Sequence, residues 1–362
     1  MRFLHTADLQ LGLKLSFVAG ENGSRARSQR FDTLRRIAGT ARDAAVQAVV
    51  IAGDLFDDNS VGPETIQQAR DALETFAPIP VLILPGNHDA ATEYSALARM
   101  DAPGHVRILN GREPVEVEGG TFFPCPLARR HETRDPTAWL PAREPGDERV
   151  RVAVAHGGVI EFSESSESPN LIDAEEVIAK GFDYLALGDW HGTFRYGDRV
   201  WYPGTPEPTH WREKEPGNVL IVELPAAGVL PKVTPVAVGR TSWLEKTVTF
   251  EHDQDVETLE KWFAGLGEKS WTLVRLSLDG HLSLGARVDL DRVLEHLAER
   301  LLCLQIREDR VTVAPTEADI QALVLEGFVG DAVEQLRAEG SRESDDALRL
   351  LYRLRRDVGG DR

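Results

Sequence analysis

Five short apolar segments in this chain each end in a cluster of polar residues, and this pattern constrains the fold more than any other feature. The segments are short and rich in β-branched residues, which is typical of strands buried on both faces. Helical spacing of apolar residues predicts helices between them, over 31–48, 63–76 and 173–180. Strands that alternate with helices indicate an α/β fold with a parallel, helix-flanked sheet.

The polar clusters at the strand ends supply oxygen and imidazole donors. They are Asp8-Leu9-Gln10, Gly53-Asp54, Gly86-Asn87-His88-Asp89, His156-Gly157 and Gly188-Asp189-Trp190-His191. The carboxyl ends of parallel strands lie along one sheet edge, so we expect these side chains to converge on one crevice. Such donors suit divalent metals such as Mn²⁺, and two close ions can polarise a phosphodiester and activate water. Each cluster alone is typical of a turn or a packed histidine; the ordered set indicates a metal site.

Composition limits the classes of function. The chain has 362 residues, 42% of them hydrophobic, which is enough apolar surface to build cores and argues against a disordered chain. Its 59 acidic and 41 basic residues give a net charge of −18, which argues against a nucleic-acid binder that relies on bulk positive charge. An enzyme that meets nucleic acid through bound metal ions is still compatible with this charge.

The compartment is predicted from two further features. Two distant cysteines, Cys125 and Cys303, form neither a disulfide framework nor a cysteine-based zinc site. Asp8 precedes any apolar run, so we expect no signal peptide, and no apolar segment approaches the ~18 residues of a membrane span. These features predict a cytoplasmic protein without a membrane partner.

A composition shift near Gly239 predicts a domain boundary. Alternating strand and helix patterns follow it, which indicates a small α+β domain. We therefore expect an α/β domain over 1–240, a small α+β cap over 241–315 and a helical tail over 316–362. The excess acidity is concentrated in the final third, away from the predicted crevice.

The ordered set of motifs resembles the calcineurin-like metallophosphoesterase superfamily. More narrowly, His5-Thr6-Ala7-Asp8, Gly53-Asp54-Leu55-Phe56-Asp57 and Pro85-Gly86-Asn87-His88-Asp89 resemble the SbcD-type DNA repair exonucleases. The likeness covers residues 1–240, whereas 241–315 matches only in layout. It implies a helix-flanked β-sandwich, and a nuclease that hydrolyses DNA phosphodiester bonds as an exonuclease or endonuclease with two Mn²⁺ or Mg²⁺ ions. It also implies a homodimer and an SbcC-like, SMC-type ATPase partner in an SbcCD-like complex.

The resemblance also implies a role for each residue. Asp54 would bridge both ions; Asp8, position 10 and His191 would complete the first site, and Asn87, His156 and position 189 the second. His88 would not bind metal but would assist the leaving group or the transition state. The chain departs from the family at Gln10 and Asp189, where the family has histidines. We expect weaker binding at the first site, and a preference for Mn²⁺ or Mg²⁺ over Zn²⁺ at the second.

Other residues are candidates for substrate binding, each with a structural alternative. Arg25 and Arg27 belong to a basic stretch that is either a phosphate-tracking patch or a solvated helix face. Trp190 either stacks on a base or packs internally, and His210 either faces DNA or lies on a plain surface loop. The basic amphipathic C-terminal helix either docks on a partner coiled coil or packs on its own domain.

Two other functions remain open from the sequence. One is a phosphoesterase that acts on a small nucleotide or cyclic nucleotide. The other is a non-catalytic subunit that binds DNA ends or an ATPase.

Overall fold

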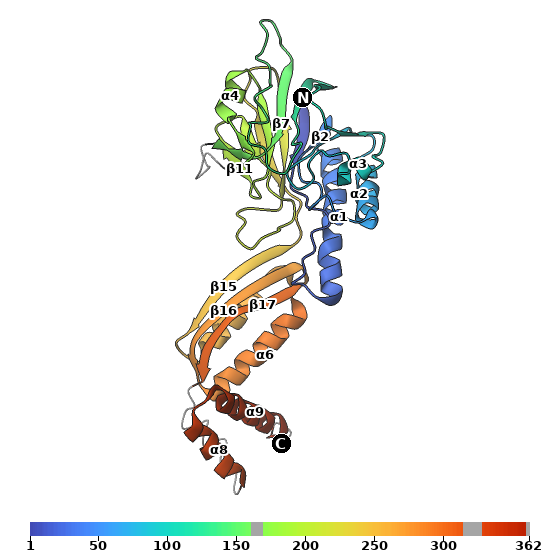
Figure 1. Cartoon of the computed structure of the whole chain (residues 1–362). Helices are drawn as coiled ribbons and strands as arrows, with labels where there is room; N and C mark the ends of the chain where they lie inside the picture. Colours follow the sequence, from blue (N-terminus) through green and yellow to red (C-terminus); the bar gives the residue numbers. More distant parts are fainter. Residues whose placement is uncertain (161–168, 314–327, 360–362) are drawn as a thin grey trace. The chain divides into compact units, whose positions relative to one another are not determined.

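The computed structural model of the chain describes residues 1–160, 169–313 and 328–359. It contains two compact units, Met1–Thr241 and Ser242–Arg362, which are described separately below (Figure 1). None of the helices in the described residues is both long and apolar enough to cross a membrane.

The first unit contains a six-stranded mixed sheet that carries three of the predicted polar clusters. Four strands run parallel side by side, and two antiparallel strands extend the sheet beyond β1. In spatial order the strands are β14 (Lys232–Ala237), β13 (Asn218–Glu223), β1 (Arg2–Thr6), β2 (Ala48–Ala52), β3 (Val81–Leu84) and β4 (Val106–Ile108).

A second six-stranded sheet carries the remaining two clusters. Its four inner strands are parallel and its two edge strands are antiparallel to their neighbours. In spatial order they are β11 (Phe194–Tyr196), β12 (Val200–Tyr202), β10 (Tyr184–Gly188), β7 (Val150–His156), β6 (Gly120–Cys125) and β5 (Val115–Val117). A small pair, β8 (Gly158–Val159) and β9 (Leu171–Ile172), follows β7.

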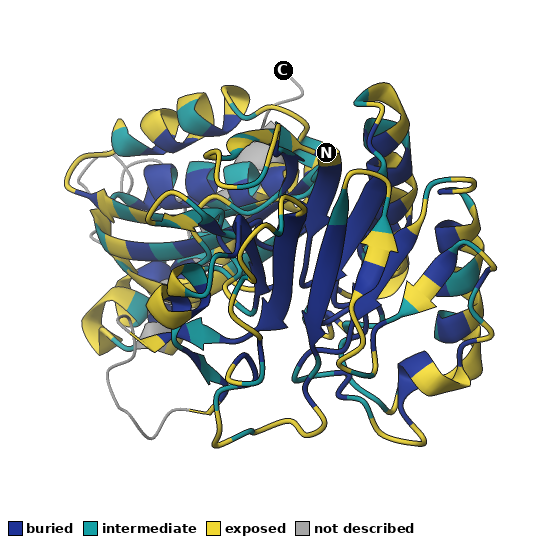
Figure 2. Cartoon of the chain, turned by 90° about the horizontal axis from the view of Figure 1, so that it is seen from above, coloured by how far each residue is buried: buried dark blue, intermediate teal, exposed yellow. Residues whose placement is uncertain are grey.

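The two sheets pack face to face through an apolar core. Phe3 of β1 meets Phe122 of β6 and Tyr184 of β10 edge-on, with ring centroids 5.4 and 5.6 Å apart. Such edge-to-face pairs add to the stabilisation from area burial. Nearly all residues of β1, β6 and β10 are buried, and Figure 2 shows the central strands of the molecule in dark blue, the colour of buried residues. The predicted helix-flanked β-sandwich is confirmed, with mixed rather than purely parallel sheets.

Helices cover the outer faces of the sandwich. The apolar sides of α1 and α2 pack on the first sheet, and that of α4 packs on the second. The helices are α1 (Gly20–Asp43), α2 (Pro63–Glu74), α3 (Ala96–Arg99) and α4 (Ala174–Ala179).

The prediction for the first helix was wrong at both ends. We expected 31–48, but α1 spans Gly20–Asp43. Its first third is mostly polar and carries no apolar periodicity that could have marked the start. At Ala45 the backbone turns with φ 49° and leads into β2.

Arg30 explains the polar start of α1. Its buried guanidinium donates to the carbonyl oxygens of Leu9 (3.0 Å), Glu207 (3.4 Å) and Pro208 (2.5 Å). It therefore fastens the loop after β1 to a distant segment. Arg30 belongs to the basic stretch, but it faces inward and does not extend a phosphate-tracking surface.

The second unit contains the alternating strands and helices that the sequence pattern predicted. Its three strands are parallel, and the apolar sides of two helices form one core with the sheet, so the unit is an α/β rather than an α+β structure. Its elements are β15 (Ser242–Phe250), α5 (Asp255–Ala264), η2 (Lys269–Trp271), β16 (Thr272–Leu282), α6 (Leu284–Arg300), β17 (Cys303–Val313), α8 (Phe328–Glu339) and α9 (Arg342–Gly359). The predicted boundary at 315/316 lies outside the described residues, so the division into cap and tail stays a prediction.

Replacement of Arg30 tests the link between the loops. Arg30→Ala leaves buried carbonyls without their donor, so we expect a loss of about 1–3 kcal/mol in the free energy of unfolding. Urea denaturation followed by circular dichroism measures it. The matched control is Arg35→Ala, an exposed α1 arginine that pairs with the exposed Asp32 (2.8 Å). Equal stability of the two variants would contradict the role given to Arg30.

Candidate metal centre

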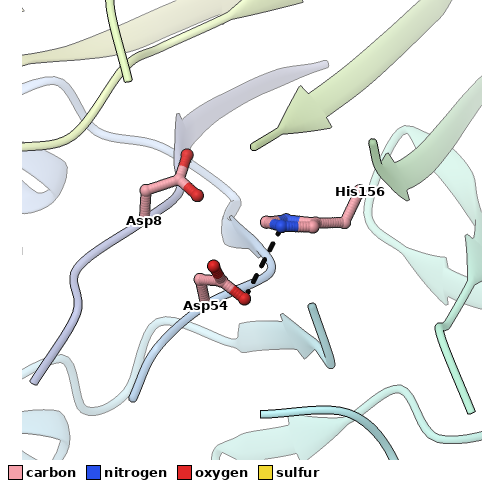
Figure 3. A group of neighbouring side chains, drawn as sticks. All are labelled: Asp8, Asp54 and His156. Carbon is pink, nitrogen blue, oxygen red and sulfur yellow. Dashed lines mark ion pairs between the residues drawn. The ribbon is translucent and has the colours of Figure 1, made fainter. Parts of the chain in front are cut away.

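The polar clusters meet at one edge of the sandwich, where strands of both sheets end. Asp8, Asp54 and His156 are all buried, and each offers one ligand atom within 4.8 Å of those of the other two. Figure 3 shows the two carboxylates and the imidazole pointing toward one another from three separate strand ends. The convergence expected from the sequence is therefore present for these three residues.

The loops after β1 and β2 run side by side and hold the carboxylates in place. The backbone N–H of Asp8 donates to the Gly53 carbonyl, and that of Gln10 donates to the Asp54 carbonyl, each at 3.1 Å. Asp8, Gln10 and Asp54 have φ values of 53°, 51° and 54°. Such left-handed conformations are uncommon for residues with a Cβ, and Asp and Asn adopt them most readily. The loops thus turn sharply enough to aim short side chains into the crevice.

Two glycines allow the close approach of the ligand-bearing loops. A Cβ at Gly53 would lie 2.0 Å from Nδ1 of His156, and one at Gly86 would lie 2.2 Å from Oδ1 of Asp54. Both distances are far below any real contact. Gly53 also has a φ of 98°, which disfavours other residues independently.

His156 is oriented by a backbone carbonyl. Its Nδ1 donates to the oxygen of Ala52 at 2.8 Å, which leaves Nε2 to face the crevice. Nε2 lies 3.1 Å from Oδ1 of Asn87, 3.5 Å from Asp54 and 3.7 Å from Asp189. Burial lowers the pKa of His156, but the carboxylates of Asp54, Asp8 and Asp189 outweigh this and raise it to about 9. Proton and metal ion would compete for the same nitrogen.

Asp8 and Asp189 come from different sheets and meet directly. The backbone N–H of Asp189 lies 3.1 and 3.2 Å from the two carboxylate oxygens of Asp8. Burial raises the pKa of Asp8 to about 6, which the nearby His156 partly opposes. Asp189 is half-buried, so its carboxylate borders the crevice.

Gln10 contacts the carboxylate predicted to bridge the ions. Its Nε2 donates to Oδ2 of Asp54 at 2.9 Å. As a metal ligand, the amide would turn over so that its oxygen faces the ion. The structure therefore places Gln10 at the predicted site, and its coordination of an ion stays a prediction.

His88 is held beside Asp54. Its backbone N–H donates to Oδ1 of Asp54 at 2.9 Å, and its Nδ1 donates to the Asp57 carbonyl at 2.6 Å. Nε2 lies 4.0 Å from Oδ2 of Asp54, and the side chain is 30% exposed. His88 therefore presents Nε2 at the mouth of the crevice, where it can reach a bound molecule.

Asp89 was part of a quoted motif but was not predicted as a site residue. It is fully buried and accepts from the backbone N–H groups of Gly86 (2.8 Å) and Phe56 (3.2 Å). Burial and the charge of Asp54 raise the pKa of Asp89 to about 7. It fixes the loop that carries Asn87 and His88.

Burial lowers the pKa of His191, but Asp8 and Asp54 are near enough for their charges to help produce a net rise. The ring of His191 stacks on that of His210 with centroids 5.9 Å apart. His210 is exposed, and Trp190 is 53% exposed with its ring 6.1 Å from that of Phe194. Both remain accessible to a substrate, and their roles stay predictions.

The two predicted substrate arginines are engaged near the start of α1. Arg25 donates to Asn22 at 3.2 Å, and Arg27 donates to the Lys14 carbonyl (3.3 Å) and to Ser24 (3.1 Å). Both side chains are half-buried. The described contacts do not bring them into the ligand cluster, so a role in DNA binding stays a prediction.

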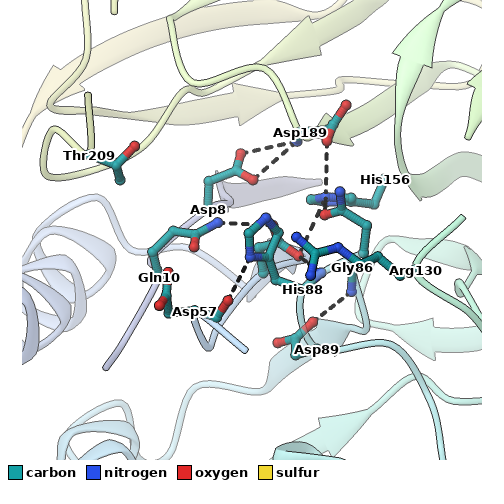
Figure 4. A network of polar contacts seen from close by, with 12 residues as sticks. Asp8, Gln10, Asp57, Gly86, His88, Asp89, Arg130, His156, Asp189 and Thr209 are labelled. Carbon is teal, nitrogen blue, oxygen red and sulfur yellow. Dashed lines mark hydrogen bonds and ion pairs between the residues drawn. The ribbon is translucent and has the colours of Figure 1, made fainter. Parts of the chain in front are cut away.

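Arg130 is a candidate that the sequence did not reveal. It lies between β6 and β7, and Figure 4 shows its side chain extending toward the polar network of the site. Asn170 clamps its backbone: Nδ2 donates to the Arg130 carbonyl at 3.0 Å, and Oδ1 accepts from the Glu132 N–H at 2.7 Å. No local pattern marks Arg130, because its position depends on this long-range clamp.

The donor set fits divalent metal ions. Three carboxylates, two amides and two imidazoles gather at one sheet edge, and burial of several carboxylates together is costly without a counter-charge. The residues that would hold ions are Asp8, Gln10, Asp54, Asn87, His156, Asp189 and His191.

Comparison with known proteins identifies the family. The sequence pattern of calcineurin-like phosphoesterases matches residues 1–193, more than half of the chain. The chain belongs to the calcineurin-like phosphoesterase family, a class of metal-dependent hydrolases, which confirms the predicted superfamily.

Two individual proteins show lower or partial similarity to this chain. The chain is 31% identical over 231 residues to the DNA double-strand break repair protein Mre11 of Haloferax volcanii, which covers 61% of this chain and 49% of that protein. It thus spans about half the length of this curated relative. A solved calcineurin-like phosphoesterase, YfkN from Bacillus subtilis, covers 66% of this chain and 90% of its own, with 13% identity and a TM-score of 0.35. That similarity is too low to support a conclusion.

Metal addition tests the centre without any substrate. Because an ion would relieve the repulsion between buried carboxylates, Mn²⁺ should raise the melting temperature of the metal-free protein. At a Mn²⁺ concentration of a hundred times Kd, the free energy of unfolding should rise by about 2.7 kcal/mol. Scanning calorimetry with and without a chelator measures it. Asp54→Ala should abolish the shift, whereas Asp101→Ala, an exposed control, should keep it. A metal-independent melting temperature in the unaltered protein would argue against the centre.

Proposed function

We propose that the chain is a DNA repair nuclease that hydrolyses phosphodiester bonds with two divalent metal ions. The observation that carries this proposal is the convergence of Asp8, Asp54 and His156 within 4.8 Å at the ends of three strands. Membership of the phosphoesterase family supports hydrolysis of a phosphate ester. The similarity to an Mre11 double-strand break repair protein supports DNA as the substrate.

Mn²⁺ is the proposed ion, with Mg²⁺ as the alternative, because Gln10 and Asp189 make the donor set richer in oxygen. When bound, the ions supply Lewis-acid polarisation of the phosphodiester and activation of a water. Asp54 contacts Gln10 of one proposed set and His156 of the other, and it would belong to both. Asp8, Gln10 and His191 would complete one set, and Asn87, His156 and Asp189 the other.

His88 would act on the substrate as a proton donor. The Asp57 carbonyl accepts from Nδ1 at 2.6 Å and holds the ring in one orientation. In the protonated ring, Nε2–H can therefore donate to the leaving oxygen or to the developing charge on the phosphate. The partial exposure of His88 is consistent with contact to a bound nucleic acid.

The assembly is proposed from the resemblance. We propose a homodimer and an SbcC-like, SMC-type ATPase partner. They would provide much of the affinity for DNA, because a chain with a net charge of −18 binds polyphosphate weakly by itself. The helix α9 carries exposed Leu350 and Leu354 and is the proposed docking element for the partner. A cytoplasmic location is proposed on the same grounds.

Substitution at Asp54 and His88 separates metal binding from chemistry. Asp54→Ala should lose both metal and activity, whereas His88→Ala should keep its metal and lose about 10²- to 10⁴-fold in rate. Turnover of linear DNA with Mn²⁺, together with metal content by elemental analysis, measures both. Equal loss of metal in the two variants would overturn this division of roles.

The choice of substrate separates the proposal from its alternatives. We expect plasmid or linear DNA to be cut, whereas turnover of only bis-p-nitrophenyl phosphate or cyclic nucleotides would indicate a small-molecule phosphoesterase. Absence of bound metal and of any activity after reconstitution would indicate a non-catalytic subunit.

Arg130 is proposed to bind a backbone phosphate beside the metal centre. Because a charge-assisted hydrogen bond contributes about 1.5–3 kcal/mol, Arg130→Ala should lower kcat/KM for DNA at least tenfold and leave the metal content unchanged. Arg129→Ala is the matched control, an exposed neighbour in the same segment. The same kcat/KM in both variants would remove Arg130 from the site.

A further inference from the structure

The ring of His191 contacts the buried side chain of an acid, Glu213, which is not among the proposed metal ligands. Its Nδ1 lies 2.7 Å from Oε1 of Glu213 and 2.8 Å from Oγ1 of Thr209. Since the carboxylate can only accept, the proton of the imidazole sits on Nδ1. Nε2 is then the ring nitrogen that keeps a lone pair for an ion.

Glu213 is itself fixed on both oxygens. The backbone N–H of Thr209 donates to its Oε2 at 2.9 Å, and the Thr209 hydroxyl donates to its Oε1. The Glu213 side chain is only 6% exposed, although its neighbours Arg212 and Lys214 are exposed. A carboxylate is rarely this buried unless a cationic or hydrogen-bonding partner offsets the cost of removing its charge from water. The imidazole of His191 is such a partner.

The loop that carries Glu213 is held against the His191 segment. A Cβ at Gly192 would lie 2.2 Å from the Lys214 carbonyl oxygen, and the backbone N–H of Thr193 donates to the Glu215 carbonyl at 3.3 Å. The two segments therefore approach backbone to backbone. Glu213 cannot move away from the imidazole without displacing the loop.

The same region is fastened to the first strand end. Thr205 donates its N–H to the His191 carbonyl at 3.0 Å and its hydroxyl to the Asp8 carbonyl at 2.8 Å. His191 and Asp8, predicted ligands of the same ion, are thus joined through one residue. Glu213 adds a contact at Nδ1, so His191 is held both through its backbone and through its ring.

We propose that Glu213 is the positioning residue of the first metal site, and that its charge offsets the neutral ligand Gln10. The inference rests on the proposed function for the existence of that site. A carboxylate on the far nitrogen of a ligating imidazole fixes the ring and makes it a stronger donor. An amide ligand at position 10 lowers the metal affinity of the first site, and the Glu213–His191 pair would restore part of it.

The test is a Mn²⁺ titration of the full chain, followed by calorimetry without substrate. Glu213→Gln keeps the side-chain size and an acceptor oxygen but removes the charge. We expect it to weaken one of the two Mn²⁺ affinities by about 10- to 100-fold and to leave the other unchanged. Glu215→Gln, an exposed acid two residues away on the same loop, is the control and should change neither affinity.

A second variant tests the link to Gln10. Gln10→His supplies a stronger donor at the first site, so the loss caused by Glu213→Gln should shrink in that background. Nitrogen-15 spectra of the histidine rings add a readout of the protonated nitrogen. His191 should carry its proton on Nδ1 in the unaltered chain, and this preference should weaken in Glu213→Gln, because an amide oxygen is a poorer acceptor than a carboxylate.

The outcomes separate the two proposals. Unchanged Mn²⁺ affinities in Glu213→Gln, or an equal loss at both sites with a lowered melting temperature, would overturn the positioning role. Two Mn²⁺ sites with the predicted selective loss, but no cleavage of DNA, would leave the positioning role intact and refute the nuclease. Absence of Mn²⁺ binding in the unaltered chain would refute both.

Discussion

The rest of this structure depends on the burial of several carboxylates at one point. Asp8, Asp54 and Asp89 are at most 1% exposed, and Asp189 lies beside them at the rim. Burial, together with the charge of Asp54, raises the pKa of Asp8 to about 6 and that of Asp89 to about 7. Divalent ions are the natural counter-charge for such a cluster.

The cluster is built at the seam between two sheets. Asp8, Asp54 and Asn87 follow strands of the first sheet, whereas His156 and Asp189 follow strands of the second. The packing of Phe3 on Phe122 and Tyr184 sets the distance between the sheets. At this distance, the lack of a side chain at Gly53 lets its loop approach the ring of His156. The site therefore depends on the core of the sandwich as much as on its own residues.

Much of this arrangement could be predicted from the sequence, because short buried strands and their polar ends are local patterns. The strands and the meeting of Asp8, Asp54 and His156 follow from them, whereas the sandwich was expected only from the family resemblance. The start of α1, the inward Arg30 and the clamp on Arg130 did not follow. Each depends on a contact between distant segments, such as that of Arg30 with Pro208, and local periodicity carries no signal for it. Glu213 was missed for the same reason, since its burial among charged neighbours arises only from the fold.

The most direct test is a crystal soaked with Mn²⁺ and measured at the manganese absorption edge. Two anomalous peaks on either side of Asp54, one near His156 and Asn87 and the other near Asp8 and His191, would agree with a two-metal phosphodiesterase. A single peak away from Asp54, or no peak at all, would contradict it.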